Sequence, residues 1–211
     1  MTAGALRPLP RSFLARPAPV VARELLGRLL VSRTEGPPLL ARIVECEAYQ
    51  EDDPASHSFR GRTARTDVMF GPPGHLYVYF TYGMHFCMNV VTGRAGEGSA
   101  VLLRAAEPLD GQERMAEARG LVPPYDPRLL CSGPARLTQS FGVTREANGI
   151  DLLGDASFAL ASGTPVPDAE VGVSARVGIR VGRERPWRFF VAGSPFLSRG
   201  PRELTRRGSP R

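Results

Sequence analysis

The chain has 211 residues, 42% of them hydrophobic, and a formal net charge of +6, so we expect one compact domain with a polyanionic partner. All 27 basic residues are arginine, and the absence of lysine excludes a Walker phosphate loop and any lysine Schiff base. There is no run of about 18 apolar residues and no signal peptide, so we expect an intracellular protein without membrane contact. The three cysteines are widely spaced and predict neither disulfides nor a zinc site.

The N-terminal part of the chain changes character near residue 18. Residues 1–17 are rich in proline and arginine and have no periodic pattern, so we expect a flexible segment that lies loosely over the surface. Pro19 suits the first turn of a helix over residues 20–26, and Gly27 suits its end. A strand is predicted to follow over residues 28–32.

Residues 39–49 predict a long strand with unusual polar content. Alternation places Ile43, Glu45, Glu47 and Tyr49 on one side of it. Two carboxylates and a tyrosine therefore share a face that the neighbouring apolar residues require to be buried or half-buried. This makes the strand a candidate for functional residues.

Residues 76–89 predict a β-hairpin around Gly83 and hold three of the five tyrosines of the chain. Tyr77 and Tyr79 share one face by the two-residue period, whereas Tyr82 lies near the tip. Aromatic strands most often contribute to a core. In a strongly basic chain, however, exposed aromatic side chains also suit stacking on nucleobases.

The strand predicted for residues 99–106 is apolar apart from Arg104, and a guanidinium in that setting requires an acidic or anionic partner. Residues 110–113, Asp-Gly-Gln-Glu, resemble a capping box and predict a helix that extends to Arg119. Three prolines make residues 121–130 irregular.

The last third of the chain predicts one short helix over residues 134–141 and strands at residues 158–161, 175–181 and 187–191. The fold class is therefore a mixed α/β (α+β) single domain. We expect a curved, largely antiparallel sheet of six to eight strands with helices at its edges and a protruding hairpin. Residues 199–211 hold many arginines and predict a basic, disordered tail.

The combined features indicate a site for a flat group. Stacking tyrosines hold a planar ligand, and an enzyme that acts on a base inside duplex DNA must extrude it at a cost of a few kcal/mol. Stacking at roughly 1–3 kcal/mol per base can offset that cost. The His-x-Glu and Pro-Cys-x-x-Cys signature of the zinc deaminases is absent.

Six segments carry a family resemblance. They are Arg42-Ile-Val-Glu-Cys-Glu-Ala-Tyr49, His57-Ser58, Leu76-Tyr-Val-Tyr-Phe-Thr-Tyr-Gly-Met-His-Phe-Cys-Met-Asn89, Leu102-Leu-Arg-Ala-Ala-Glu-Pro108, Leu130-Cys-Ser-Gly-Pro134 and Gly193-Ser-Pro195. In order and spacing, from about residue 23 to residue 198, the chain resembles the alkyladenine (3-methyladenine) DNA glycosylases of the mammalian type and would be a bacterial-like homologue.

The resemblance implies a reaction and the residues that perform it. Glu47 would be the base that activates a water molecule, and Arg104 and the backbone carbonyl of Val177 would position that water. Tyr82 would be the wedge that fills the gap in the base stack. Apart from the resemblance, Met84 and Met88 are typical packing residues, and the position of Met84 at the hairpin tip also suits contact with DNA. The damaged purine would leave as free base, and an abasic site would remain in the strand.

The resemblance also implies how the extruded base is held. Tyr49, His57 and Tyr79 would sandwich it, Tyr77 would line the same pocket, and Asn89 would screen purines. The partner would be double-stranded DNA that contains damaged purines.

No cofactor and no metal ion are implied for this reaction, and we expect a monomer in the cytoplasm, at the nucleoid if the source is a bacterium. The glycosylase domain would comprise residues 18–198. Because the chain has no lysine to form an imine, we expect a monofunctional enzyme without lyase activity.

The same residues suggest two other interpretations. A non-catalytic nucleic-acid-binding module would use the same aromatic hairpin but would not need Glu47. An unrelated hydrolase with Glu45 and Glu47 as an acid/base pair fails on geometry, because strand neighbours at i and i+2 lie about 6–7 Å apart and point to the same side. Glu45 is better explained as a structural carboxylate.

Overall fold

The structure is a computed structural model that describes residues 6–34, 36–81, 83–155 and 157–200, and these residues form one antiparallel eight-stranded sheet. The strands are β1 (Leu29–Ser32), β2 (Leu39–Tyr49), β3 (Leu76–Thr81), β4 (His85–Val91), β5 (Ala100–Asp110), β6 (Phe158–Ala161), β7 (Val171–Ser174) and β8 (Arg188–Val191). The helices are α1 (Arg11–Leu14), α2 (Ala18–Glu24), α3 (Gln112–Ala118), α4 (Arg128–Cys131) and α5 (Pro134–Ser140), with short 3₁₀ turns at Asp67–Phe70, Arg145–Ala147 and Asp168–Glu170. The expected fold class is confirmed.

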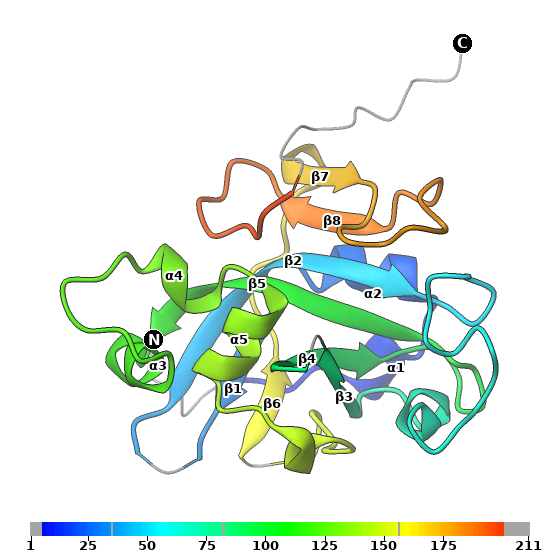
Figure 1. Cartoon of the computed structure of the whole chain (residues 1–211), viewed down its shortest axis with the longest axis horizontal. Helices are drawn as coiled ribbons and strands as arrows, with labels where there is room; N and C mark the ends of the chain where they lie inside the picture. The colour runs from blue at the N-terminus through cyan, green and yellow to red at the C-terminus, as the bar shows by residue number, and fades with distance from the viewer. Residues whose placement is uncertain (1–5, 35, 82, 156, 201–211) are drawn as a thin grey trace.

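Strand β2 organises the sheet. The strand order is β3-β4-β5-β2-β1-β6, and β8 also pairs with β2 and with β7. Along one edge β2 pairs with β5, whereas its other edge pairs first with β1 and then, from Glu45 to Glu47, with β8. Figure 1 shows β2 and β5 crossing the centre, with β7 and β8 above them and α3, α4 and α5 together at one side. The second half of β2 is therefore hydrogen-bonded on both edges.

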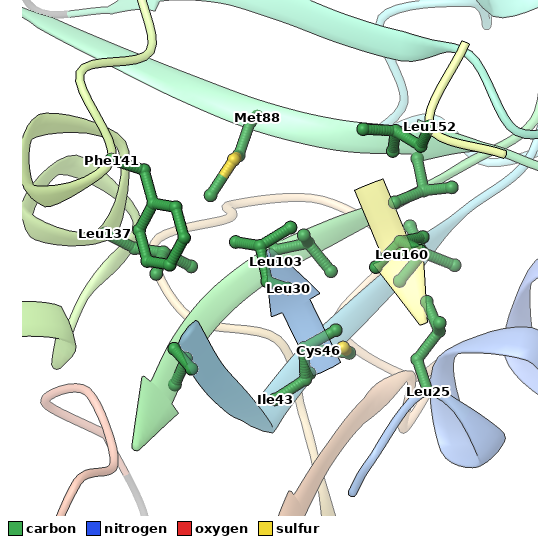
Figure 2. Close-up of a cluster of buried hydrophobic side chains, with 14 of the residues drawn as sticks. Leu25, Leu30, Ile43, Cys46, Met88, Leu103, Leu137, Phe141, Leu152 and Leu160 are labelled. Carbon is green, nitrogen blue, oxygen red and sulfur yellow. The ribbon is translucent and has the colours of Figure 1, made fainter. Parts of the chain in front are cut away.

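The side-chain alternation of β2 is interrupted, which corrects one sequence expectation. The pairing with β5 shifts in register between Ile43 and Glu45 and again between Glu45 and Cys46. Ile43 consequently joins Cys46 in the main core, as Figure 2 shows, instead of sharing a face with Glu45 and Glu47. A β-bulge places an extra residue in one strand and so inverts the alternation beyond it.

The main core lies between this face of the sheet and the helices. In Figure 2, Leu137 and Phe141 approach Met88 and Leu103 from one side, and Leu25 approaches from another. Full burial of each such side chain contributes about 1.5–3 kcal/mol. The opposite face of β2 and β5 carries the polar residues described below.

The expectation that residues 1–17 lie loosely and without pattern was wrong for the described part of that segment. Arg11–Leu14 form α1, and the side chains of Leu9 and Leu14 are buried. Pro8 forms an antiparallel bridge with Ala161, next to β6. These apolar anchors and the bridge hold the segment against the domain.

Two further local predictions were wrong. No strand forms at residues 175–181: β7 ends at Ser174, and Gly178 has a positive φ angle of 81° that interrupts an extended chain. The capping box is not formed: β5 extends to Asp110, whose carboxylate accepts from the Gly111 N–H (2.9 Å), and Gly111 is the N-cap without a side-chain bond.

Two further elements were not expected: α4 begins within residues 121–130, which were predicted to be irregular, and β7 corresponds to no predicted strand. The helix after Pro19, the hairpin around Gly83 and the strands at residues 29–32, 39–49, 158–161 and 188–191 are confirmed. None of the helices in the described ranges is long and apolar enough to cross a bilayer.

Candidate active site

One row of cross-strand neighbours runs over five strands of the sheet. Tyr77 pairs with Asn89, Asn89 with Leu102, Leu102 with Glu47, and Glu47 with Arg188. Residues directly opposite one another in adjacent strands point to the same side. The register of the sheet therefore brings three predicted site residues, Glu47, Tyr77 and Asn89, onto one face although they come from three segments of the chain.

Glu47 has donors on both carboxylate oxygens. The Tyr49 hydroxyl donates to Oε2 (2.8 Å), and the Val177 backbone N–H donates to Oε1 (2.7 Å). The Nη1 atom of Arg104 lies 3.3 Å from Oε2. Burial raises the pKa of Glu47 above its ordinary value, while Arg104 and the two hydrogen bonds oppose that shift. The structure thus places the Val177 N–H on the carboxylate, whereas the predicted role of the Val177 carbonyl remains a prediction.

Glu45 is the centre of a separate buried network. Its Oε1 accepts from the Nε atoms of Arg104 and Arg188, both at 2.8 Å, and from the Ser198 hydroxyl at 2.7 Å, while its Oε2 accepts from the Ser198 N–H at 2.7 Å. Although burial acts to raise it, the pKa of Glu45 is lowered, because two guanidinium groups and these hydrogen bonds favour the carboxylate. The expected acidic partner of Arg104 is confirmed, and Glu45 holds its guanidinium beside Glu47.

A cavity of about 260 Å³ opens on this face. Its lining includes Tyr49, Ala55, His57, Met69, Tyr77, Tyr79, Thr81, Cys87, Asn89, Ala100, Leu102, Arg104, Pro134, Val177, Gly178 and Ile179. The carboxylate of Glu47 is fully buried behind the lining residues Tyr49, Arg104 and Val177. All of the predicted base-binding residues therefore meet at one cavity, next to the predicted catalytic carboxylate.

The aromatic residues of the cavity contact one another. The ring of His57 lies edge-on to that of Tyr79, with centroids 4.5 Å apart, and His57 Nδ1 is 3.0 Å from the Tyr77 hydroxyl. Partial burial of the imidazole and the nearby Arg65 guanidinium lower the pKa of His57. His57 is consequently neutral near pH 7, and the wall that it forms with Tyr79 carries no charge of its own.

Asn89 is held from the neighbouring strand. Its Nδ2 donates to the Tyr77 carbonyl at 3.1 Å, and the residue is buried at the cavity. Cys87 also lines the cavity, and burial raises the pKa of its thiol, so it is a neutral side chain here. The Asn89 amide, which the Tyr77 carbonyl holds in place, limits the size of the group that fits beside it in the cavity.

The hairpin tip is only partly described. Tyr82, the predicted wedge, lies outside the described residues. Met84 is 69% exposed, and Phe80, which packs against Phe86 with ring centroids 5.0 Å apart, is also exposed. The tip therefore presents apolar side chains to the surroundings, as the prediction for Met84 requires.

Four residues beside the site were missed in the sequence. Arg188 and Ser198 bind Glu45, and Arg176 binds Asp53 in a second buried ion pair whose side chains are both fully buried. An arginine between apolar residues, the signal used for Arg104, was also present at Arg188, which precedes Phe-Phe-Val. Ser198 gave no such signal.

A groove of about 1010 Å³ adjoins the cavity and shares Arg104, Pro134 and Val177 with it. Arg128, Arg136 and Arg199 line the groove together with serine and glycine residues. Planar guanidinium groups suit bidentate contacts with phosphate. Among the described residues no group of three or more His, Cys, Asp or Glu is placed to hold a metal ion.

Comparisons with known proteins point to one family. The family described as "Methylpurine-DNA glycosylase" matches residues 12–195. A protein of Carboxydothermus hydrogenoformans is 46% identical over 191 residues, which cover 90% of this chain and 98% of the relative. One from Burkholderia lata is 50% identical over 201 residues (94% and 93%), and one from Streptomyces avermitilis is 49% identical over 195 residues (90% and 91%). All three relatives carry the name "Putative 3-methyladenine DNA glycosylase".

Proposed function

This chain belongs to the methylpurine-DNA glycosylase family, and on that premise we propose that it is a DNA repair enzyme that extrudes alkylated or deaminated purines from duplex DNA and hydrolyses their N-glycosidic bonds. The observation that carries the proposal is the position of the Glu47 carboxylate, which is buried directly behind an aromatic cavity of about 260 Å³. The net charge of +6 suits a DNA partner.

Glu47 acts as the general base. A water oxygen attacks the sugar carbon C1′, the bond from C1′ to the purine nitrogen breaks, and its electron pair leaves with the base. The water proton passes to the Glu47 carboxylate, whose negative charge also stabilises positive charge that develops on the sugar. Arg104, held by Glu45, and the Val177 carbonyl position the water. An alkylated purine is already cationic and leaves as a neutral base, so modest general-base assistance suffices.

The aromatic cavity binds the extruded base. Tyr49, His57 and Tyr79, which all line the cavity, sandwich the base, while the Tyr77 hydroxyl contacts the His57 ring. A neutral imidazole accepts either a cationic or a neutral purine without charge repulsion. Tyr82 and Met84 fill the gap that the base leaves in the duplex.

The adjoining groove binds the strand that carries the lesion. Arg128, Arg136 and Arg199 line the groove that adjoins the cavity at Arg104, so phosphates of the extruded nucleotide and its neighbours have cationic partners there. These contacts are independent of base sequence, as repair of scattered lesions requires.

Asn89 sets purine discrimination. Its amide is buried and fixed on the Tyr77 carbonyl, so it collides with the exocyclic amine of guanine. We expect Asn89→Ser to excise normal guanine faster than the parent protein does, because the smaller side chain removes the collision. Guanine release from undamaged duplex by parent and variant checks this role, and equal release by both would contradict it.

The enzyme is monofunctional. Glycosylases that also cleave the strand attack the sugar with an amine, and this chain has no lysine. We expect borohydride to trap no protein–DNA adduct and strand breaks to appear only after alkali or an added abasic-site nuclease. The measurement is gel analysis of the reaction with and without borohydride; a high yield of trapped adduct would overturn this claim and the assignment of water as the nucleophile.

The deciding experiment for the proposed function is incubation with duplex DNA that contains 3-methyladenine, hypoxanthine or 1,N6-ethenoadenine, followed by chromatography of free bases. Release of at least one of these bases supports the glycosylase. Tight binding of all three duplexes without release would instead favour the non-catalytic binding module.

A further inference from the structure

A second buried ion pair lies behind the cavity wall. The Arg176 guanidinium donates hydrogen bonds to both carboxylate oxygens of Asp53. Its Nη2 donates to Oδ1 at 2.9 Å, and its Nη1 donates to Oδ2. Its other Nη hydrogens go to backbone carbonyls, Nη1 to Ala48 (2.9 Å) and Nη2 to Gly182 (3.1 Å). One fully buried guanidinium therefore joins three separate segments.

Each of these three segments contributes to the cavity. Ala48 lies in β2 between Glu47 and Tyr49. Asp53 starts the turn that leads to His57, and its Oδ1 also accepts from the Ala55 N–H at 3.1 Å. Gly182 belongs to the loop that carries the lining residues 177–179. The pair thus links three segments that carry residues of the cavity wall.

Arg176 also controls two of the donors to Glu47. Its Cζ atom lies 4.6 Å from the centroid of the Tyr49 ring, on which the guanidinium stacks. The Tyr49 hydroxyl and the N–H of Val177, the residue next to Arg176, both bind the Glu47 carboxylate. Displacement of the Arg176 side chain would therefore move both donors together, whereas Arg104 is held independently by Glu45.

We propose that Arg176 and Asp53 are positioning residues for base excision, which hold Tyr49 and Val177 on Glu47 and keep the base-stacking wall in place. The inference rests on the proposed function of the same site. Neither side chain lines the cavity, so both act through the residues that do. Nothing in the sequence signals that the two residues, 123 positions apart, would pair.

The chain supplies a matched control pair. Arg185 and Asp52 are the neighbouring ion pair, with Nη1 3.1 Å from Oδ2, and Arg185 stacks on Trp187 at 4.7 Å from the ring centroid. Arg176 lies 5.4 Å from the same ring. The control pair is more exposed than the positioning pair and does not line the cavity. Trp187 is the one tryptophan of the chain, so its emission reports on both pairs.

The test compares Arg176→Lys with Arg185→Lys in single-turnover base release. Lysine keeps the charge but cannot bind four acceptors or stack as a plane. We expect Arg176→Lys to lower the rate by about ten- to a hundredfold, as misplacement of reacting groups does, with unchanged affinity for undamaged duplex. Arg185→Lys should retain the parental rate. A parental rate in Arg176→Lys, or an equal loss in both variants, would overturn the proposal.

A pH profile separates positioning from a loss of folded protein. Weaker donation to Glu47 raises its pKa, so the acid limb of the rate should move to higher pH in Arg176→Lys and stay in place in Arg185→Lys. The titratable and charged groups around Glu47 are Glu45, Cys46, Tyr49, Tyr79, Cys87, Arg104 and Arg188. Neither variant substitutes any of these groups, and an unshifted acid limb in Arg176→Lys would count against the proposal.

Should Arg176→Lys fail to fold, judged by Trp187 emission and thermal unfolding, the double variant Arg176→Met with Asp53→Leu takes its place. Apolar replacement of both members of a buried pair often preserves stability. We expect a folded protein with the same rate loss, and a folded double variant with the parental rate would overturn the proposal. If the parent itself releases no base, the proposed function fails; if the parent is active and the variants match it, this inference alone fails.

Discussion

Glu47→Gln is expected to lower the rate of base release by roughly 10²–10⁴-fold through the loss of general-base assistance, while binding of lesion-containing duplex remains. The amide keeps the volume of the side chain, and its one oxygen can accept the hydrogen bond of either Tyr49 or Val177, but it cannot take the proton of water. Single-turnover release of free base and a binding titration on the same duplex measure the two quantities separately.

The pH dependence of the parent enzyme should report the same group. A general base must be ionised, so the rate falls as the pH drops through the pKa of Glu47. Because burial raises this pKa, we expect the acid limb above about pH 4.3, the ordinary glutamate value. Glu107→Gln is the control, since Glu107 pairs with Arg42 between the same two strands and does not line the cavity. Base release by Glu47→Gln at the parental rate would refute the catalytic assignment.

Glu45→Gln is expected to have the largest effect on stability, a loss of about 3–5 kcal/mol in the free energy of unfolding. The substitution leaves the guanidinium groups of Arg104 and Arg188 buried without the carboxylate that both contact at 2.8 Å. Urea unfolding of parent and variant at pH 7 measures the difference. The surface variant Glu107→Gln should lose no more than about 1 kcal/mol. The effect of Glu45→Gln on the rate of base release per folded molecule should be milder than that of Glu47→Gln.

The sign of the pH dependence follows from the lowered pKa of Glu45. A carboxyl group whose pKa is lower in the folded state than in the unfolded state stabilises the protein above the unfolded value, about 4.3, and loses that contribution as the pH falls through the folded pKa. The stability difference between parent and Glu45→Gln should therefore shrink as the pH drops below about 4. A difference that stays constant over this range would show that the charge of Glu45 is not its source.

Much of the local structure was predictable from the sequence, because local signals act over a few residues. Pro19 in the first turn and Gly27 after the last residue predicted α2, and the aromatic residues around Gly83 predicted the hairpin. The same reasoning placed Ile43 on the wrong face, since a β-bulge depends on how β5 pairs with β2 and not on the composition of either strand. It also extended a strand over residues 175–181, where the chain instead turns so that Arg176 reaches Asp53.

By itself the sequence determined the chemistry of the site: two carboxylates in one strand, an arginine that needed an acidic partner, tyrosines in a hairpin, and no lysine. Tertiary structure alone decided which groups meet. The row from Tyr77 through Asn89 to Glu47 exists only in the observed register, and Val177 reaches Glu47 across 130 residues. The reason is physical, because side-chain type and local propensity are properties of neighbouring residues, whereas strand register and the pairing of buried charges are chosen by the free energy of the whole packed chain.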